Sequence, residues 1–132
     1  MKFTIQTETL KKGLEIVNHA TSSITTTPIL ENILIKVGFN TLVLISNNLE
    51  MAIEHVISDN ITILKEGAFC VPSKIFTSYI SLINDAEVEI ELIKNESIHI
   101  ITSSSHLKIK GLDASEFPLI PTIKQDINLS IK

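Results

Sequence analysis

The stretch from residue 28 to residue 57 restricts the fold most, because it contains three short runs with the period of a β-strand. The runs are 28–37, 41–46 and 49–57. In the third run, four of the odd positions are apolar (Leu49, Met51, Ile53 and Ile57), with Glu50 and Glu54 at even positions. A period of two predicts strands with one buried face, and the Gly and Asn residues at the joints favour tight turns. This stretch therefore predicts an antiparallel meander that must pack on the rest of the chain.

The order of the predicted elements repeats along the chain. A strand, a helix and three strands are predicted at 2–6, 8–20 and 29–57. The same order follows at 67–71, 73–83 and 87–112, and its last strand spans 106–112. Side-chain similarity between the halves is weak, so the repeat is one of element order. A duplicated βαβββ unit predicts an α+β fold in which two helices pack on two antiparallel sheets around one core.

The C-terminal part of the sequence predicts a domain boundary. Residues 113–121 contain Pro118 and Pro121 and are expected to form a linker, whereas 126–132 alternate again like the first strand of a further unit. We expect residues 1–120 to form one domain, followed by a linker and the first strand of a second, missing domain at 121–132. The alternative is an ordinary α+β domain with a C-terminal edge strand.

Composition narrows the functional classes. The 132 residues carry a net charge of −4 and no arginine, which argues against tight nucleic-acid binding over the whole surface but permits a local basic face. Five acids and one lysine lie between residues 84 and 102, whereas the predicted helices are neutral or slightly basic. No apolar run approaches the length of about 18 residues that a membrane helix needs. A single cysteine favours a reducing cytosol.

An enzyme is the first alternative to a binding protein, and the sequence offers it little support. Cys70 lies in an apolar run before Pro72, where an inert buried thiol is expected. His99 and His106 are seven residues apart on different predicted strands, and the chain has neither a CxxC nor an HExxH motif. We therefore expect no catalytic residue, no metal site and no cofactor.

Several short motifs in fixed order resemble a known family. They are Met1-Lys-Phe-Thr4, Pro28-Ile-Leu-Glu-Asn-Ile-Leu-Ile35, Thr41-Leu-Val-Leu44, Asn48-Leu-Glu-Met51, Val71-Pro72 and Phe117-Pro118. The chain is similar to the first domain of bacterial DNA sliding clamps, the β subunit of DNA polymerase III. This resemblance implies a DNA clamp fold and a non-catalytic, cytoplasmic processivity factor of DNA replication. Three such domains per chain, and two chains head to tail, would close a homodimeric ring around duplex DNA.

The resemblance also implies which residues face DNA. Lys74 is the first candidate, followed by Lys11 and Lys12 on the first helix; the alternative for all three is simple solubility. Ile24 occupies the position of a common basic residue in the loop 21–27, so a contact from this loop is doubtful.

The resemblance further implies a subunit interface on the edge strand 106–112. Its candidate residues are Ser104, His106, Leu107, Lys108, Tyr79 and Ile83. The polymerase and the clamp loader would bind through domains absent here, and no membrane is involved. The alternative is an α+β protein-binding module that acts through this sheet edge and has no role on DNA.

Overall fold

The structure is a computed structural model that describes residues 1–18, 32–47 and 52–117. The first half contains β1 (Lys2–Gln6), α1 (Thr7–Val17), β2 (Asn32–Val37), β3 (Leu42–Asn47), β4 (Ala52–Ile57) and β5 (Ile61–Lys65). The second half contains β6 (Gly67–Pro72), α2 (Ser73–Ser81), β7 (Glu87–Ile93), β8 (Ser97–Ile101), β9 (His106–Lys110), β10 (Leu112–Asp113) and the short 3-10 helix η3 (Ala114–Glu116). Two helices with antiparallel sheets confirm the predicted α+β class.

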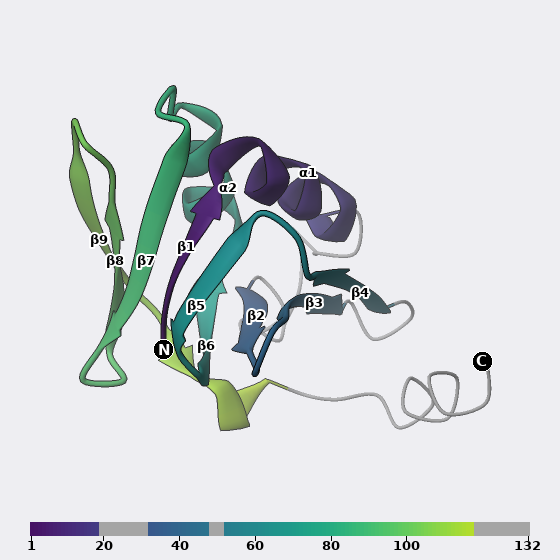
Figure 1. Cartoon of the computed structure of the whole chain (residues 1–132). Helices are drawn as coiled ribbons and strands as arrows, with labels where there is room; N and C mark the ends of the chain where they lie inside the picture. Colours follow the sequence, from purple (N-terminus) through teal and green to yellow (C-terminus); the bar gives the residue numbers. More distant parts are fainter. Residues whose placement is uncertain (19–31, 48–51, 118–132) are drawn as a thin grey trace.

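The two halves exchange their first strands (Figure 1). Sheet A has the order β5-β1-β7-β8-β9, so β1 from the first half joins the meander of the second. Sheet B has the order β10-β6-β2-β3-β4, so β6 from the second half joins the meander of the first. All strand pairs are antiparallel. Because each sheet takes a strand from the other half, neither half can complete a sheet alone.

The repeat is longer than the sequence analysis predicted. β5 lies beside β1 in sheet A and β10 lies beside β6 in sheet B, so each half ends with an equivalent strand. The prediction of one strand over 106–112 was wrong, because β9 ends at Lys110 and Leu112 pairs with Cys70 in sheet B. Gly111 lies between them, where a Cβ atom would be 2.0 Å from the carbonyl oxygen of Cys70. Only a residue without a side chain permits this close approach.

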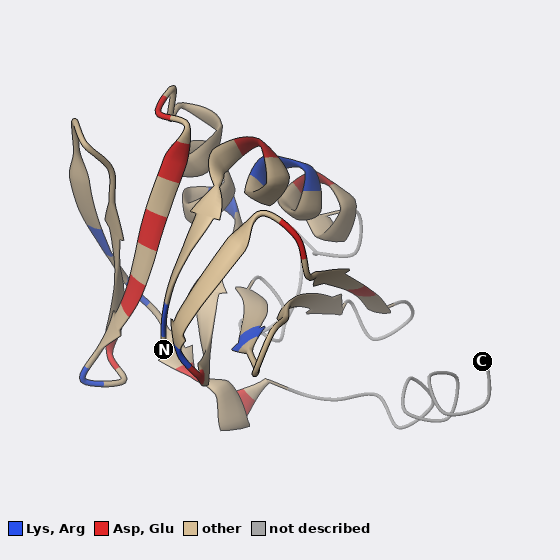
Figure 2. Cartoon of the chain, in the orientation of Figure 1, with Lys and Arg blue, Asp and Glu red and all other residues tan. Residues whose placement is uncertain are grey.

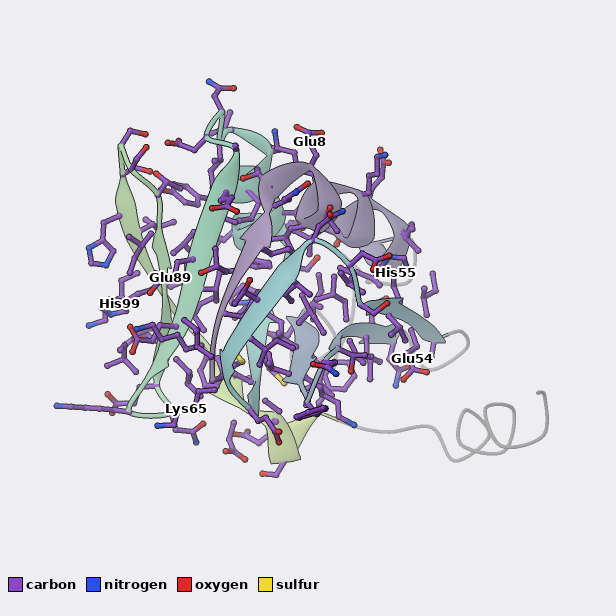
Figure 3. All side chains as sticks on the ribbon, in the orientation of Figure 1. Glu8, Glu54, His55, Lys65, Glu89 and His99 are labelled. Atoms are coloured by element: carbon purple, nitrogen blue, oxygen red, sulfur yellow. The ribbon has the colours of Figure 1, made fainter. Side chains whose placement is uncertain are left out.

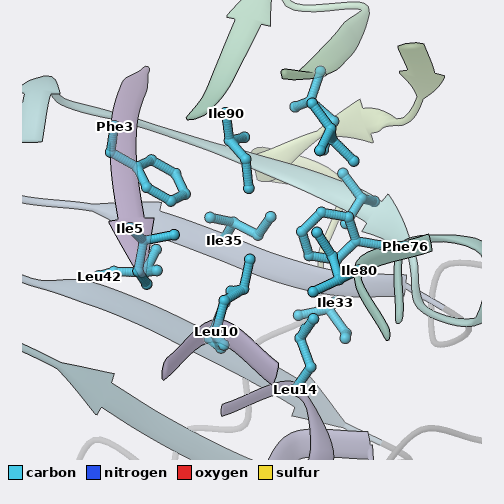
Figure 4. Packing of buried hydrophobic residues seen from close by; sticks show 14 of the residues in the cluster. Phe3, Ile5, Leu10, Leu14, Ile33, Ile35, Leu42, Phe76, Ile80 and Ile90 are labelled. Atoms are coloured by element: carbon cyan, nitrogen blue, oxygen red, sulfur yellow. The ribbon is translucent and has the colours of Figure 1, made fainter. Parts of the chain in front are cut away.

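The main core lies between the two sheets and the two helices (Figure 4). Phe3 and Ile35 contribute fully buried side chains from the two sheets, and Phe76 does so from α2. On α1, Leu10 and Leu14 are one helical turn apart and only 1% exposed, so they form the buried face of the helix. No helix in the described residues is long and apolar enough to cross a membrane.

A second, smaller core covers the outer face of sheet B. It contains Leu34, Ile45, Cys70 and Phe117, with Ala114 of η3 packed against it. The predicted linker 113–121 was therefore wrong for residues 113–117. Asp113 pairs with Phe69 of β6, and Ala114 and Phe117 close this core. The rest of that linker, the predicted strand 126–132 and the proposed domain boundary after residue 120 lie outside the described residues.

Candidate functional site

The two helices lie side by side (Figure 1). Hydrogen bonds between residues that are distant in the sequence join them. At the end of α1, the amide of Asn18 donates to Thr77 Oγ1 on α2 at 2.8 Å, and Ser73 Oγ donates to Asn18 Oδ1. At the other end of the pair, Lys11 Nζ donates to the carbonyl oxygen of Ile83 at 3.0 Å, just beyond the last turn of α2. These contacts hold α1 and α2 as one surface.

The three lysines predicted to face DNA differ in their environment. Lys12 on α1 and Lys74 on α2 are exposed, and neither forms an ion pair within the described part of the chain. Lys11 is half-buried. Its ammonium group donates a hydrogen bond to the carbonyl oxygen of Ile83 and lies 3.5 Å from Glu8 Oε2, so it already has partners within the domain. Ile24 lies outside the described residues. Among the described residues of the two helices, Lys12 and Lys74 are thus the lysines that are exposed and have no acidic partner.

The opposite charge gathers on the outer face of sheet A. Glu87, Glu89 and Glu91 alternate along β7 with the buried Val88 and Ile90. Figure 2 shows these acidic positions as a row along β7, and the lysines of α1 on the helix. The domain therefore carries its densest run of acids on the sheet surface, away from the exposed lysines of the helices.

The predicted subunit edge is the free side of β9. Within the described residues, β9 pairs with β8 on one side only. Leu107 is half-buried on β9, whereas His106 and Lys108 are exposed. A strand edge with unpaired backbone groups can accept a strand from another chain.

The loop before β9, residues 102–105, forms hydrogen bonds to α2 and to Asp85. Ser104 Oγ donates to Asp85 Oδ1 at 3.1 Å, and the hydroxyls of Tyr79 and Ser105 are 2.7 Å apart. Hydrogen bonds from the side chain of Ser103 and, more weakly, of Ser104 hold the pKa of Asp85 below its ordinary value. The loop is therefore fixed to the start of β7 and to the helix.

The apolar residues beside this edge differ in their exposure. Ile83 is only 5% exposed and packs in the main core, so it supports the edge from inside. Leu82, which the sequence analysis did not select, is 75% exposed. Leu82 and Ile83 both line a small hollow of about 140 Å³, together with Tyr79 and Ser104. The family resemblance pointed to Ile83 and not to the more exposed Leu82.

The residues considered for catalysis do not form a catalytic arrangement. Cys70 is fully buried, and burial, followed by the nearby charges of Asp113 and Glu116, raises its pKa to about 12. A thiol in this state is a poor nucleophile. By contrast, His99 and His106 lie against each other across β8 and β9, with ring nitrogens 3.0 Å apart. The sequence did not reveal this contact, because it depends on the register in which β8 and β9 pair.

Comparison with known proteins agrees with this architecture. Residues 1–121 match the family "DNA polymerase III beta subunit, N-terminal domain". The beta sliding clamp of Bacillus subtilis is 32% identical over 132 residues, which cover 95% of this chain and 35% of the relative. The beta sliding clamp of Staphylococcus epidermidis is 30% identical over 142 residues, covering 100% of this chain and 37% of the relative.

Solved structures show the same fold. The DNA polymerase sliding clamp from Bacillus subtilis superposes with a TM-score of 0.89 at 30% identity, covering 92% of this chain and 33% of that one. The Helicobacter pylori beta clamp bound to a DNA ligase peptide gives 0.84 at 25% identity, with the same coverage of 92% and 33%. The chain spans about a third of the length of these relatives. It belongs to the DNA polymerase III beta-subunit family, whose N-terminal domain it matches along its described length.

Proposed function

We propose that this chain is the first domain of a ring-shaped sliding clamp, a non-catalytic processivity factor that encircles duplex DNA and tethers the replicative polymerase. The observation that carries the proposal is the continuous match of residues 1–121 to the beta-subunit N-terminal domain. Its site of action is the cytoplasm, where the chromosome is replicated.

In this proposal α1 and α2 face the hole of the ring. Lys12 and Lys74 lie on that surface without acidic partners in the described residues, so each is available to a phosphate. Lysine–phosphate contacts are independent of sequence and are weakened by salt. Such contacts suit a protein that must slide, because a closed ring is retained by topology and needs little affinity. The acidic outer face of sheet A would then point away from DNA.

The free edge of β9 is proposed to meet a second subunit. Leu107, Tyr79 and the exposed Leu82 supply apolar contacts, and His106, Ser104 and Lys108 supply polar ones. The complementary surface would belong to another domain of the partner, so this domain alone is expected to be monomeric. The Helicobacter pylori clamp structure holds a DNA ligase peptide, and we propose that polymerase and loader peptides bind outside this domain.

The test uses the full-length protein that contains this chain. It is loaded with its clamp loader on nicked circular DNA, the complex is isolated, and the circle is then cut once. Retention on the circle with rapid loss after cutting is the expected result, since a ring slides off a free end. Equal retention on both forms would instead favour a protein-binding module that acts through its sheet edge.

A further inference from the structure

Two histidines meet on the outer face of sheet A, close to its free edge. His99 lies on β8 opposite Lys108, and His106 lies on β9 opposite Ile101, so the histidines are diagonal neighbours. Nε2 of His106 is 3.0 Å from Nδ1 of His99, and the ring centroids are 4.9 Å apart. Figure 3 shows His99 on the side of the sheet that faces away from the helices. Neither ring belongs to the cores described above.

The distance between these nitrogens suits a shared metal ion. Imidazole is a preferred ligand of Zn²⁺, Ni²⁺ and Cu²⁺. Two nitrogens that each lie about 2.0–2.1 Å from one metal are about 2.9 Å apart at a right angle and about 3.3 Å apart at a tetrahedral angle. The separation of 3.0 Å falls in this interval. The same contact is a hydrogen bond, in which one ring nitrogen donates to the other. Metal binding requires the tautomers in which both nitrogens carry a lone pair. Rotation of each ring about its Cβ–Cγ bond, where the torsional preference is broad, would then direct both lone pairs at one point.

The surroundings supply one acidic and one basic neighbour. Glu91 on β7 is the direct cross-strand partner of His99, and Lys108 is its partner on β9. Within the described residues, no group of three or more His, Cys, Asp or Glu side chains could hold a metal ion. The two imidazoles are therefore the primary ligands, with the other positions open to water. This nitrogen set disfavours Mg²⁺ and Ca²⁺, which take oxygen ligands.

We propose that His99 and His106 form a two-imidazole site for a divalent transition-metal ion of the Zn²⁺, Ni²⁺ and Cu²⁺ class. The metal bridges β8 and β9 and so ties the edge strand of sheet A to its neighbour. The site needs only residues of this chain. It shares His106 with the subunit edge proposed above, so metal binding and subunit contact would compete for that side chain.

In the experiment, ZnCl₂ is titrated into the untagged 132-residue chain. Calorimetry measures the affinity and the number of bound ions, and long-range ¹H–¹⁵N spectra identify the imidazole nitrogens that bind the metal. One ion per chain is expected, with shifts at Nδ1 of His99 and Nε2 of His106. His99→Gln and His106→Gln each remove the chelate and should weaken binding at least about tenfold. His55→Gln is the matched control, because His55 lies on β4 in the other sheet. It should bind Zn²⁺ like the unmodified chain.

Stability provides a second readout. Zn²⁺ at ten times its dissociation constant should raise the folded-to-unfolded ratio of the unmodified chain about elevenfold. The same concentration should not change this ratio in a variant that carries both His99→Gln and His106→Gln. Absence of saturable binding would overturn the proposal. So would full affinity in either single variant, or an equal loss in His55→Gln, since each result would place the metal elsewhere.

Discussion

Replacing Gly111 by alanine should destabilise the domain strongly. Gly111 lies where the chain leaves sheet A and enters sheet B. A Cβ atom there would lie 2.0 Å from the carbonyl oxygen of Cys70 and 2.5 Å from Cε2 of Phe69. Both atoms belong to β6, which pairs with β2 on one side and β10 on the other. A carbonyl within such a strand cannot turn aside, so the chain at Gly111 must move instead.

The expected cost follows from what that movement disrupts. Overpacking a fixed interior costs about 1–3 kcal/mol. Displacing β10 and η3 from β6 would also expose part of Phe117, which is 4% exposed; full burial of such a side chain contributes about 1.5–3 kcal/mol. Alanine restricts the unfolded chain and returns about 0.4–1 kcal/mol. We expect the free energy of unfolding to fall by about 3 kcal/mol.

Urea unfolding followed by far-UV circular dichroism measures this loss. With a slope of about 2 kcal/mol per molar urea, the midpoint should fall by about 1.5 M. Gly38→Ala is the control, because the nearest atom to its new Cβ is Thr41 Oγ1 at an ordinary 3.5 Å. Its stability should stay within about 0.5 kcal/mol of the unmodified chain. Equal midpoints for the two variants would refute the steric argument.

Three further predictions concern the helices and the buried thiol. In the full-length protein, Lys74→Ala should reduce the slope of log affinity for DNA against log salt concentration by about 0.9. Lys2→Ala on sheet A should leave this slope unchanged. Gel-shift titrations at several salt concentrations measure both slopes. Phe76→Ala should lower the free energy of unfolding in urea by about 3–5 kcal/mol, whereas the neighbouring Ile75→Ala, 56% exposed, should change it little. Because the pKa of Cys70 is about 12 when folded and 9.0 ordinarily, the unfolded thiol loses its proton first, so stability should fall as pH rises between these values. Cys70→Ala should remove that part of the pH dependence, and no difference between the two chains would contradict the burial argument.

Part of the candidate site was predictable from periodicity. On α1, Lys12 lies between the buried Leu10 and Leu14 in sequence and is exposed, as is Lys74, two residues before the buried Phe76 on α2. On β7, the glutamates alternate with the buried Val88 and Ile90. In each case the signal was local, because side chains a few residues apart share a face by backbone geometry alone.

Contacts between distant residues were not predictable in this way. Lys11 resembled Lys12 in sequence, yet its ammonium caps the carbonyl oxygen of Ile83, 72 residues away. Nothing in the sequence pattern linked His99 to His106. The β8–β9 register places their ring nitrogens 3.0 Å apart. Such pairings depend on strand register and helix packing, which a local pattern does not specify.

Local periodicity and short motifs in fixed order were enough to predict most of the helices and strands up to residue 110, their order and the family. They did not predict the strand break at Gly111 or the elements that follow it. Only the folded molecule shows that β1 and β6 exchange halves, that the chain passes from sheet A to sheet B at Gly111, and that Phe117 closes a second core. Each of these outcomes depends on which surfaces can be buried together. That choice minimises exposed apolar area over the whole molecule, and no short segment contains the information to make it.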